Sequence, residues 1–151
     1  MTDPMHWYYA PYHKDRLVWP MTEAEAAERA AMIKRTKRAE EVPTRLAAFQ
    51  RVLDPDALPQ AVVEAQAAWD QAQAAWNQAQ DAWYKKAHNA RRLDAWNPAH
   101  VAWYQASDAW HQAVRTHHAE IDAQRLREYP DAPPYDIDRG LILPTGQPCA
   151  D

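Results

Sequence analysis

The sequence predicts an all-α protein built around an antiparallel helical hairpin with coiled-coil-like tryptophan and alanine packing, with a preceding helix and an extended arm at each end. Two observations carry this prediction. Tryptophan recurs every seven residues in two series, and alanine and glutamine, which favour helix, fill many of the positions between them. Proline is concentrated towards both ends of the chain, where it interrupts helices.

The N-terminal arm is expected over residues 1–20, ahead of a helical domain over residues 21–129. Pro4, Pro11 and Pro20 interrupt any helix in the arm. Its many aromatic side chains suit contacts with other surfaces. The residues expected to make these contacts are Trp7, Tyr8, Tyr9, Tyr12 and Trp19.

The helical domain begins with a predicted helix at about residues 22–42. Thr22 and Glu25 have the spacing of a capping box, in which each side chain binds the backbone N–H of the other residue. Acidic residues occupy the start of this stretch and basic residues its end, which suits the helix dipole. Pro43 ends or kinks the helix, and a short amphipathic helix is expected at about 44–53.

The repeat itself predicts helices at about residues 59–94 and 98–128. With tryptophan at heptad position a, alanine occupies most d positions, so that indoles fill holes above small residues in a coiled-coil seam. Two helices share only one seam, so we expect some indoles to meet residues 23–53 or a second copy of the chain. The predicted core and interaction residues are Trp69, Trp76 and Trp83 in the first series and Trp96, Trp103 and Trp110 in the second.

A reversal of the chain is expected between the two series, because their spacing rotates the second stripe by about 140° on a straight helix. We favour a turn near 94–97, where Asn97 suits an N-cap and Pro98 the first helical position. That turn would also stagger the indoles. A turn at His88-Asn89 would place facing indoles at one level, where crowding is expected. A single helix of about 70 residues, bent at Pro98, is the remaining alternative.

The C-terminal arm is expected over residues 130–151, which are rich in proline and hold both glycines, Gly140 and Gly146. Its apolar stretch is expected to form one short strand or an anchoring contact. The contact residues predicted in this arm are Tyr135, Leu141, Ile142 and Leu143.

Several classes of site lack the residues that they need. No glycine precedes Gly140, so phosphate-binding loops cannot be built. Cys149, the single cysteine, lies in the C-terminal arm, and hydroxyl side chains such as Ser107 are scarce in the helical part. No Glu-x-x-His segment of the kind found in di-metal bundles occurs. We therefore predict no enzyme, no catalytic residues, no metal and no cofactor.

Charge and hydropathy bound the partners and the location. The net charge of −4 gives no general reason to bind nucleic acid. No apolar run approaches the roughly 20 residues of a membrane-spanning helix, and no secretory signal is visible. The expected location is the cytoplasm, or the virion if the protein is viral. A weak nucleic-acid hypothesis rests on one basic cluster, which also fits a solvated helix end: Lys34, Arg35, Lys37 and Arg38.

The function predicted from these features is that of a non-enzymatic structural protein. We expect a homo-oligomer whose arms dock onto neighbouring subunits, with a component of a phage or viral particle as the specific expectation. The alternative is a small regulatory or inhibitory protein that binds a host protein or nucleic acid.

Overall fold

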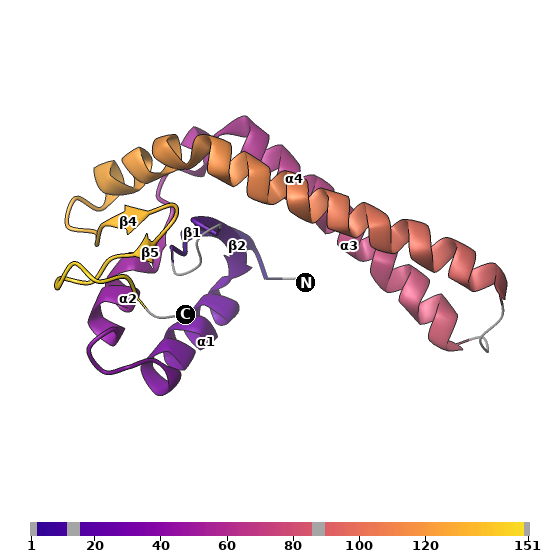
Figure 1. Ribbon diagram of the computed structural model, residues 1–151, viewed down its shortest axis with the longest axis horizontal. Coiled ribbons are helices and arrows are strands. Elements are labelled where there is room, and N and C mark those ends of the chain that lie inside the picture. The colour runs from indigo at the N-terminus through magenta and orange to yellow at the C-terminus, as the bar shows by residue number, and fades with distance from the viewer. Residues whose placement is uncertain (1–2, 12–15, 86–89, 150–151) are drawn as a thin grey trace. The chain divides into compact units, whose positions relative to one another are not determined.

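The computed structural model describes residues 3–11, 16–85 and 90–149 (Figure 1). The chain divides into two compact units. We call Met1–Leu58 together with Val114–Asp151 the mixed unit, and Pro59–Ala113 the hairpin unit. The described residues are mostly helical but include short strands, so the all-α prediction is correct only in part.

A three-stranded antiparallel sheet replaces the extended N-terminal arm in the mixed unit (Figure 1). Strand β1 (Met5–Tyr9) lies between β2 (Val18–Thr22) and β3 (Gln50–Arg51). Aromatic side chains fit a pleated surface as well as they fit an extended arm, which is why the arm was predicted wrongly.

Pro20 does not prevent this strand pairing. Ala10 N–H donates to Leu17 O at 2.9 Å, and hydrogen-bonded pairs alternate along an antiparallel ladder. Pro20, opposite Trp7, therefore falls in a non-hydrogen-bonded pair. The N–H that proline lacks is not needed at that position.

The first helix, α1 (Glu23–Thr36), begins at the predicted capping box. Glu25 N–H donates to Thr22 Oγ1 at 3.1 Å, and Thr22 N–H donates to Glu25 Oε2 at 2.8 Å. Pro43 lies in the first turn of α2 (Val42–Ala48), where its missing N–H has no partner to lose.

The expected helix at 44–53 is too long. Phe49 follows the end of α2, and the chain then enters β3 and the 3-10 helix η1 (Pro55–Ala57). The helix ends early because residues 50 and 51 pair with β1 as strand β3.

The C-terminal segment also folds back on its own unit. Strands β4 (Tyr135–Asp136) and β5 (Gly140–Leu141) form a small hairpin after α4 (Ala90–Glu128). Of the predicted apolar stretch, only Leu141 lies in a strand, and Ile142 forms an isolated bridge with Pro148. The Nη2 of Arg125, on α4, donates to Pro133 O at 2.8 Å.

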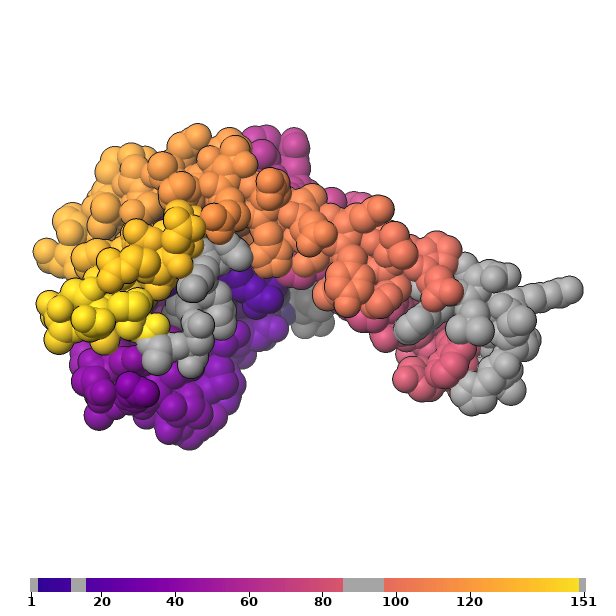
Figure 2. All heavy atoms as spheres, viewed as in Figure 1, coloured from indigo at the N-terminus to yellow at the C-terminus, as the bar shows by residue number. Residues whose placement is uncertain are grey.

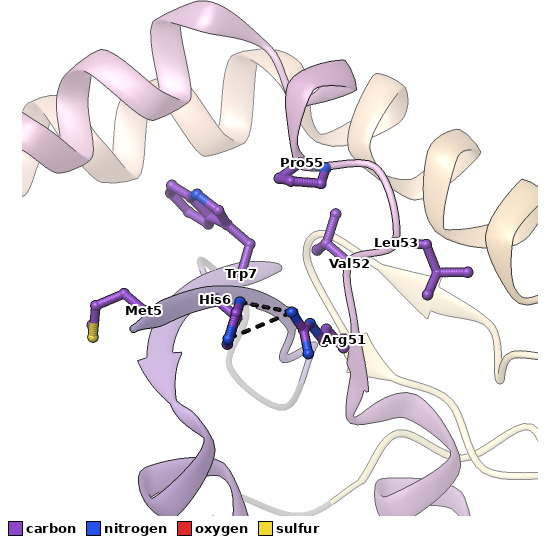
Figure 3. Close-up of a pocket in the computed structure, with 7 residues that line it drawn as sticks. All are labelled: Met5, His6, Trp7, Arg51, Val52, Leu53 and Pro55. Atoms are coloured by element: carbon purple, nitrogen blue, oxygen red, sulfur yellow. Dashed lines mark hydrogen bonds between the residues drawn. The ribbon is translucent and has the colours of Figure 1, made fainter. Parts of the chain in front are cut away.

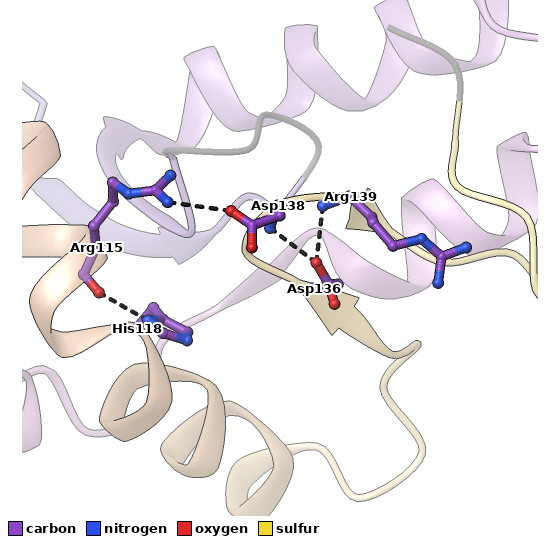
Figure 4. A network of polar contacts seen from close by, with 5 residues as sticks. All are labelled: Arg115, His118, Asp136, Asp138 and Arg139. Atoms are coloured by element: carbon purple, nitrogen blue, oxygen red, sulfur yellow. Dashed lines mark hydrogen bonds and ion pairs between the residues drawn. The ribbon is translucent and has the colours of Figure 1, made fainter.

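Two turns of this segment use the only glycines, both at φ 83°. Gly140 follows a turn in which Asp136 Oδ1 accepts the N–H groups of Asp138 and Arg139, each at 2.8 Å (Figure 4). Gly146 closes the next turn by donating to Leu143 O at 2.8 Å. The left-handed conformation explains glycine at both positions.

The core of the mixed unit combines apolar and charged side chains. Tyr9, Leu17 and Ile121 are fully buried. The ion pair between Arg45 Nε and Glu41 Oε2, at 3.1 Å, is buried on both sides. A buried charge needs such a partner, because an unpaired one is costly away from water.

The hairpin unit consists of α3 (Gln60–Lys85) and the first part of α4. These helices pack against each other, which confirms the predicted helical hairpin. The favoured turn near 94–97 is wrong, because those residues lie inside α4, as does Pro98. The alternative turn site at His88-Asn89 lies outside the described residues.

Candidate interaction surface

The indoles of the two helices are staggered along the seam, since Trp69 lies as close to Trp103, with ring centroids 6.1 Å apart, as it does to Trp110. The ring centroids of Trp76 and Trp103 are 4.9 Å apart, and those of Trp69 and Trp110 are 6.3 Å apart. Residue numbers fall on one helix as they rise on the other, as antiparallel packing requires. The crowding expected of indoles at one level does not occur, because the rings are staggered and tilt against one another by 39° to 58°.

Burial of these indoles is uneven along the hairpin. Trp110 is fully buried and Trp69 nearly so, whereas Trp76, Trp83 and Trp103 are half-buried. Of the predicted core residues, Trp69 and Trp110 are therefore buried as a core requires. The other three expose part of the indole ring to solvent. The side chain of Trp96 lies outside the described part of α4.

Four rings form a closed cluster, which we call the aromatic quartet: Trp76, His100, Trp103 and Tyr104. Around the cluster the centroids are 4.8 Å apart for Trp76–His100, 4.7 Å for His100–Tyr104, 5.1 Å for Trp103–Tyr104 and 4.9 Å for Trp76–Trp103. Trp103 Nε1 donates to Gln73 Oε1, which fixes its indole against α3. Tyr104 is 54% exposed, so a rigid aromatic edge faces solvent.

The quartet lies within a stretch that carries no Asp, Glu, Lys or Arg on either helix. This uncharged belt covers residues 71–80 of α3 and 95–107 of α4. Because Trp76 contacts Trp103, the two stretches lie at one level. Val101, 53% exposed, adds an apolar side chain. In Figure 2 the atoms of α4, orange to salmon, take up much of the visible face of this unit, with atoms of α3 in pink beneath them.

The belt shares two features with the cores of protein interfaces, which are a lack of charged residues and several aromatic rings. A quarter of the whole chain is charged, so an uncharged stretch on two adjacent helices is unusual for a solvated surface. Cores of protein–protein interfaces are depleted in charge and enriched in aromatic residues. The sequence reveals this feature directly, but its meaning depends on knowing that the two stretches are neighbours.

The predicted arm residues mostly make contacts inside the mixed unit. Tyr8 and Tyr9 are buried, and the ring centroid of Tyr8 is 5.4 Å from that of Phe49. Burial raises the pKa of Tyr9 above its ordinary value, and the charge of Glu128 raises it further. The other arm residues divide by burial: Trp7, Trp19, Tyr135, Ile142 and Leu143 are half-buried, Leu141 is fully buried, and Tyr12 lies outside the described residues.

The predicted basic cluster lies at the C-terminal end of α1. Lys34, Arg35 and Arg38 are exposed, and Lys37 is half-buried. Arg35 Nη2 pairs with Glu28 Oε1 at 3.2 Å, which offsets part of the positive charge. Cations here suit the negative end of the helix dipole, which accounts for the cluster without a ligand.

A pocket of about 340 Å³ beside the sheet was not foreseen (Figure 3). Its polar residues are His6 and Arg51, with Arg51 Nη2 donating to His6 Nδ1 at 2.8 Å. The sequence gives no signal for this pair, since the residues are 45 positions apart and meet only because β1 pairs with β3. The pocket is lined by Met5, His6, Trp7, Arg51, Val52, Leu53 and Pro55.

Further comparisons add no family to this description. Within the described ranges, no group of three His, Cys, Asp or Glu side chains is placed to hold a metal ion. No described helix is long and apolar enough to cross a membrane. Comparison of the chain with protein families, with curated proteins and with solved structures finds no match.

Proposed function

We propose that this chain is a non-enzymatic structural protein that assembles with copies of itself through the uncharged belt of the hairpin unit. The observation that carries the proposal is the belt, with Tyr104 and Val101 exposed beside half-buried indoles. Covering this surface would remove apolar area from water at a place where no charge has to be desolvated.

A second copy is the occupant that the belt fits best. Closed dimers use the same patch on both subunits, so the patch must complement itself. An uncharged surface of alanine, glutamine and aromatic rings meets this condition without paired opposite charges. Two hairpins packed in this way make a four-helix bundle, in which the coiled-coil-like seam is shared by four helices.

The finer expectations stay predictions. Docking of the arms onto neighbours would use residues that remain exposed or half-buried, such as Trp7 and Trp19. Membership of a phage or viral particle is the specific form of this proposal. A regulatory binder acting on a foreign protein is favoured instead if the chain is monomeric.

Sedimentation velocity on two matched variants tests the interface. Val101→Glu places a charge in the belt, and Gln112→Glu places the same charge on an exposed site of α4 outside it. We expect Val101→Glu to weaken self-association at least about tenfold, which is about 1.4 kcal/mol, with Gln112→Glu unchanged. Equal behaviour of the two variants would place the interface elsewhere.

A further inference from the structure

Met5, the first residue of β1, lies beyond the part of the strand that β3 covers and offers a backbone N–H and C=O to a partner strand. Val52 N–H donates to Trp7 O at 2.8 Å, so Trp7 points its polar groups toward the β3 side of the sheet. Polar groups of an antiparallel strand alternate between its two sides. Met5, two residues earlier, therefore points its own N–H and C=O to the same side.

No strand covers Met5 on that side within the described residues. β3 ends at Arg51, and Leu53 N–H donates to Glu128 Oε1 at 2.6 Å as the chain leaves the sheet. The next residues enter η1. The pocket lies at this edge, beside the exposed side chains of Met5 and Leu53.

The charged group of the pocket, the guanidinium of Arg51, is a hydrogen-bond donor and never an acceptor. His6 Nδ1 is therefore the acceptor in its 2.8 Å hydrogen bond with Arg51 Nη2. Arg51 has five N–H groups and meets Glu23 at 3.5 Å. Figure 3 shows Trp7 on one side of β1 and His6 with Arg51 on the other.

We propose that this edge binds an extended acidic peptide segment of a partner protein. The peptide adds as a short strand beside Met5, as in other cases of strand addition to a sheet edge. One of its apolar side chains packs among Trp7, Leu53 and Pro55, and a carboxylate accepts hydrogen bonds from Arg51. The site is separate from the uncharged belt, so either proposal stands without the other.

Fluorescence anisotropy with labelled synthetic peptides on the full chain tests the proposal. The probe alternates valine with glutamate, and the control peptide carries lysine in place of glutamate. We expect the glutamate peptide to bind at least tenfold more tightly. Equal binding of both peptides, or no saturable binding up to about 1 mM, would overturn the proposal.

Protein variants locate the site. Arg51→Gln is expected to weaken glutamate-peptide binding at least tenfold, whereas Arg38→Gln, at an exposed arginine of α1, leaves it unchanged. Met5→Pro removes the edge N–H without touching the pairing with β2, and should weaken binding relative to Met5→Leu. Circular dichroism confirms that each variant folds. Folded variants that all bind like the wild type would overturn the assignment.

Discussion

The hairpin unit and the mixed unit are each stabilised internally by different kinds of interaction. The hairpin unit relies on one seam of stacked rings between two helices, with half-buried indoles and an uncharged belt. The mixed unit joins distant parts of the chain through strands, buried ion pairs and long-range hydrogen bonds such as Tyr129 Oη–H to Arg51 O, at 2.6 Å. A two-helix seam leaves several indoles half-buried, whereas Tyr9, Leu17 and Ile121 of the mixed unit are fully buried. This difference places the candidate for self-association on the hairpin.

The seam should be most sensitive at its fully buried indole. Trp110→Ala is expected to lower the free energy of unfolding by about 3–5 kcal/mol, because the side chain is removed from a closed site. Urea unfolding followed by circular dichroism measures the change. Trp83→Ala, at a half-buried position, serves as the control and should cost less. Equal losses at both positions would contradict the burial difference along the hairpin.

The mixed unit should respond most to loss of a buried charge partner. Glu41→Ala is expected to cost about 3 kcal/mol, because Arg45 then keeps a buried charge without this carboxylate. The same unfolding experiment measures it. Glu28→Ala, which removes the exposed partner of Arg35, should change stability by less than about 1 kcal/mol. A loss at Glu41 as small as that at Glu28 would show that the buried pair is not needed.

The parts of the fold that the sequence predicts are those that depend on local patterns, and the parts it misses depend on long-range contacts. The heptad spacing and the capping box at Thr22 are local patterns, and the hairpin and the start of α1 appear as predicted. The sheet was missed because Tyr8 meets Arg51 across more than forty residues, which no local period records. The turn was misplaced because Asn97-Pro98 has good N-cap chemistry, yet both residues lie within α4, whose tryptophans pack against those of α3.

Of the two candidate sites, one can be recognised in the sequence and the other cannot. The uncharged belt is visible in the sequence once the hairpin pairing is known, since Trp76 and Trp103 identify the level. The pocket at His6 and Arg51 is not visible, because both residues read as ordinary surface polar positions.

A smaller effect is expected at the turn of the C-terminal hairpin. Gly140→Ala should lower stability by about 1 kcal/mol, because φ of 83° is strained for a residue with a Cβ. No atom lies near the added methyl group, so the loss is conformational and not steric. Thermal unfolding detects it. Ala132→Gly, outside any helix or strand, controls for the change of residue type.

The smallest effect concerns the pH dependence at Asp136. Hydrogen bonds from Arg139 N–H and then Asp138 N–H hold the pKa of this carboxyl below its ordinary value. A depressed pKa stabilises the folded state above the ordinary pKa, and this contribution is lost as the pH falls through the folded pKa. NMR titration of Asp136 should show the lowered pKa. The stability of Asp136→Asn should therefore fall less than that of the wild type under acid conditions.

Self-association through the hairpin is the central claim, and the solution mass of the full chain tests it most directly. Light scattering over a dilution series should give a defined multiple of 17.4 kDa that persists at low concentration. A mass of 17.4 kDa at every concentration would contradict the claim, and would mean that the uncharged belt serves a partner other than a second copy.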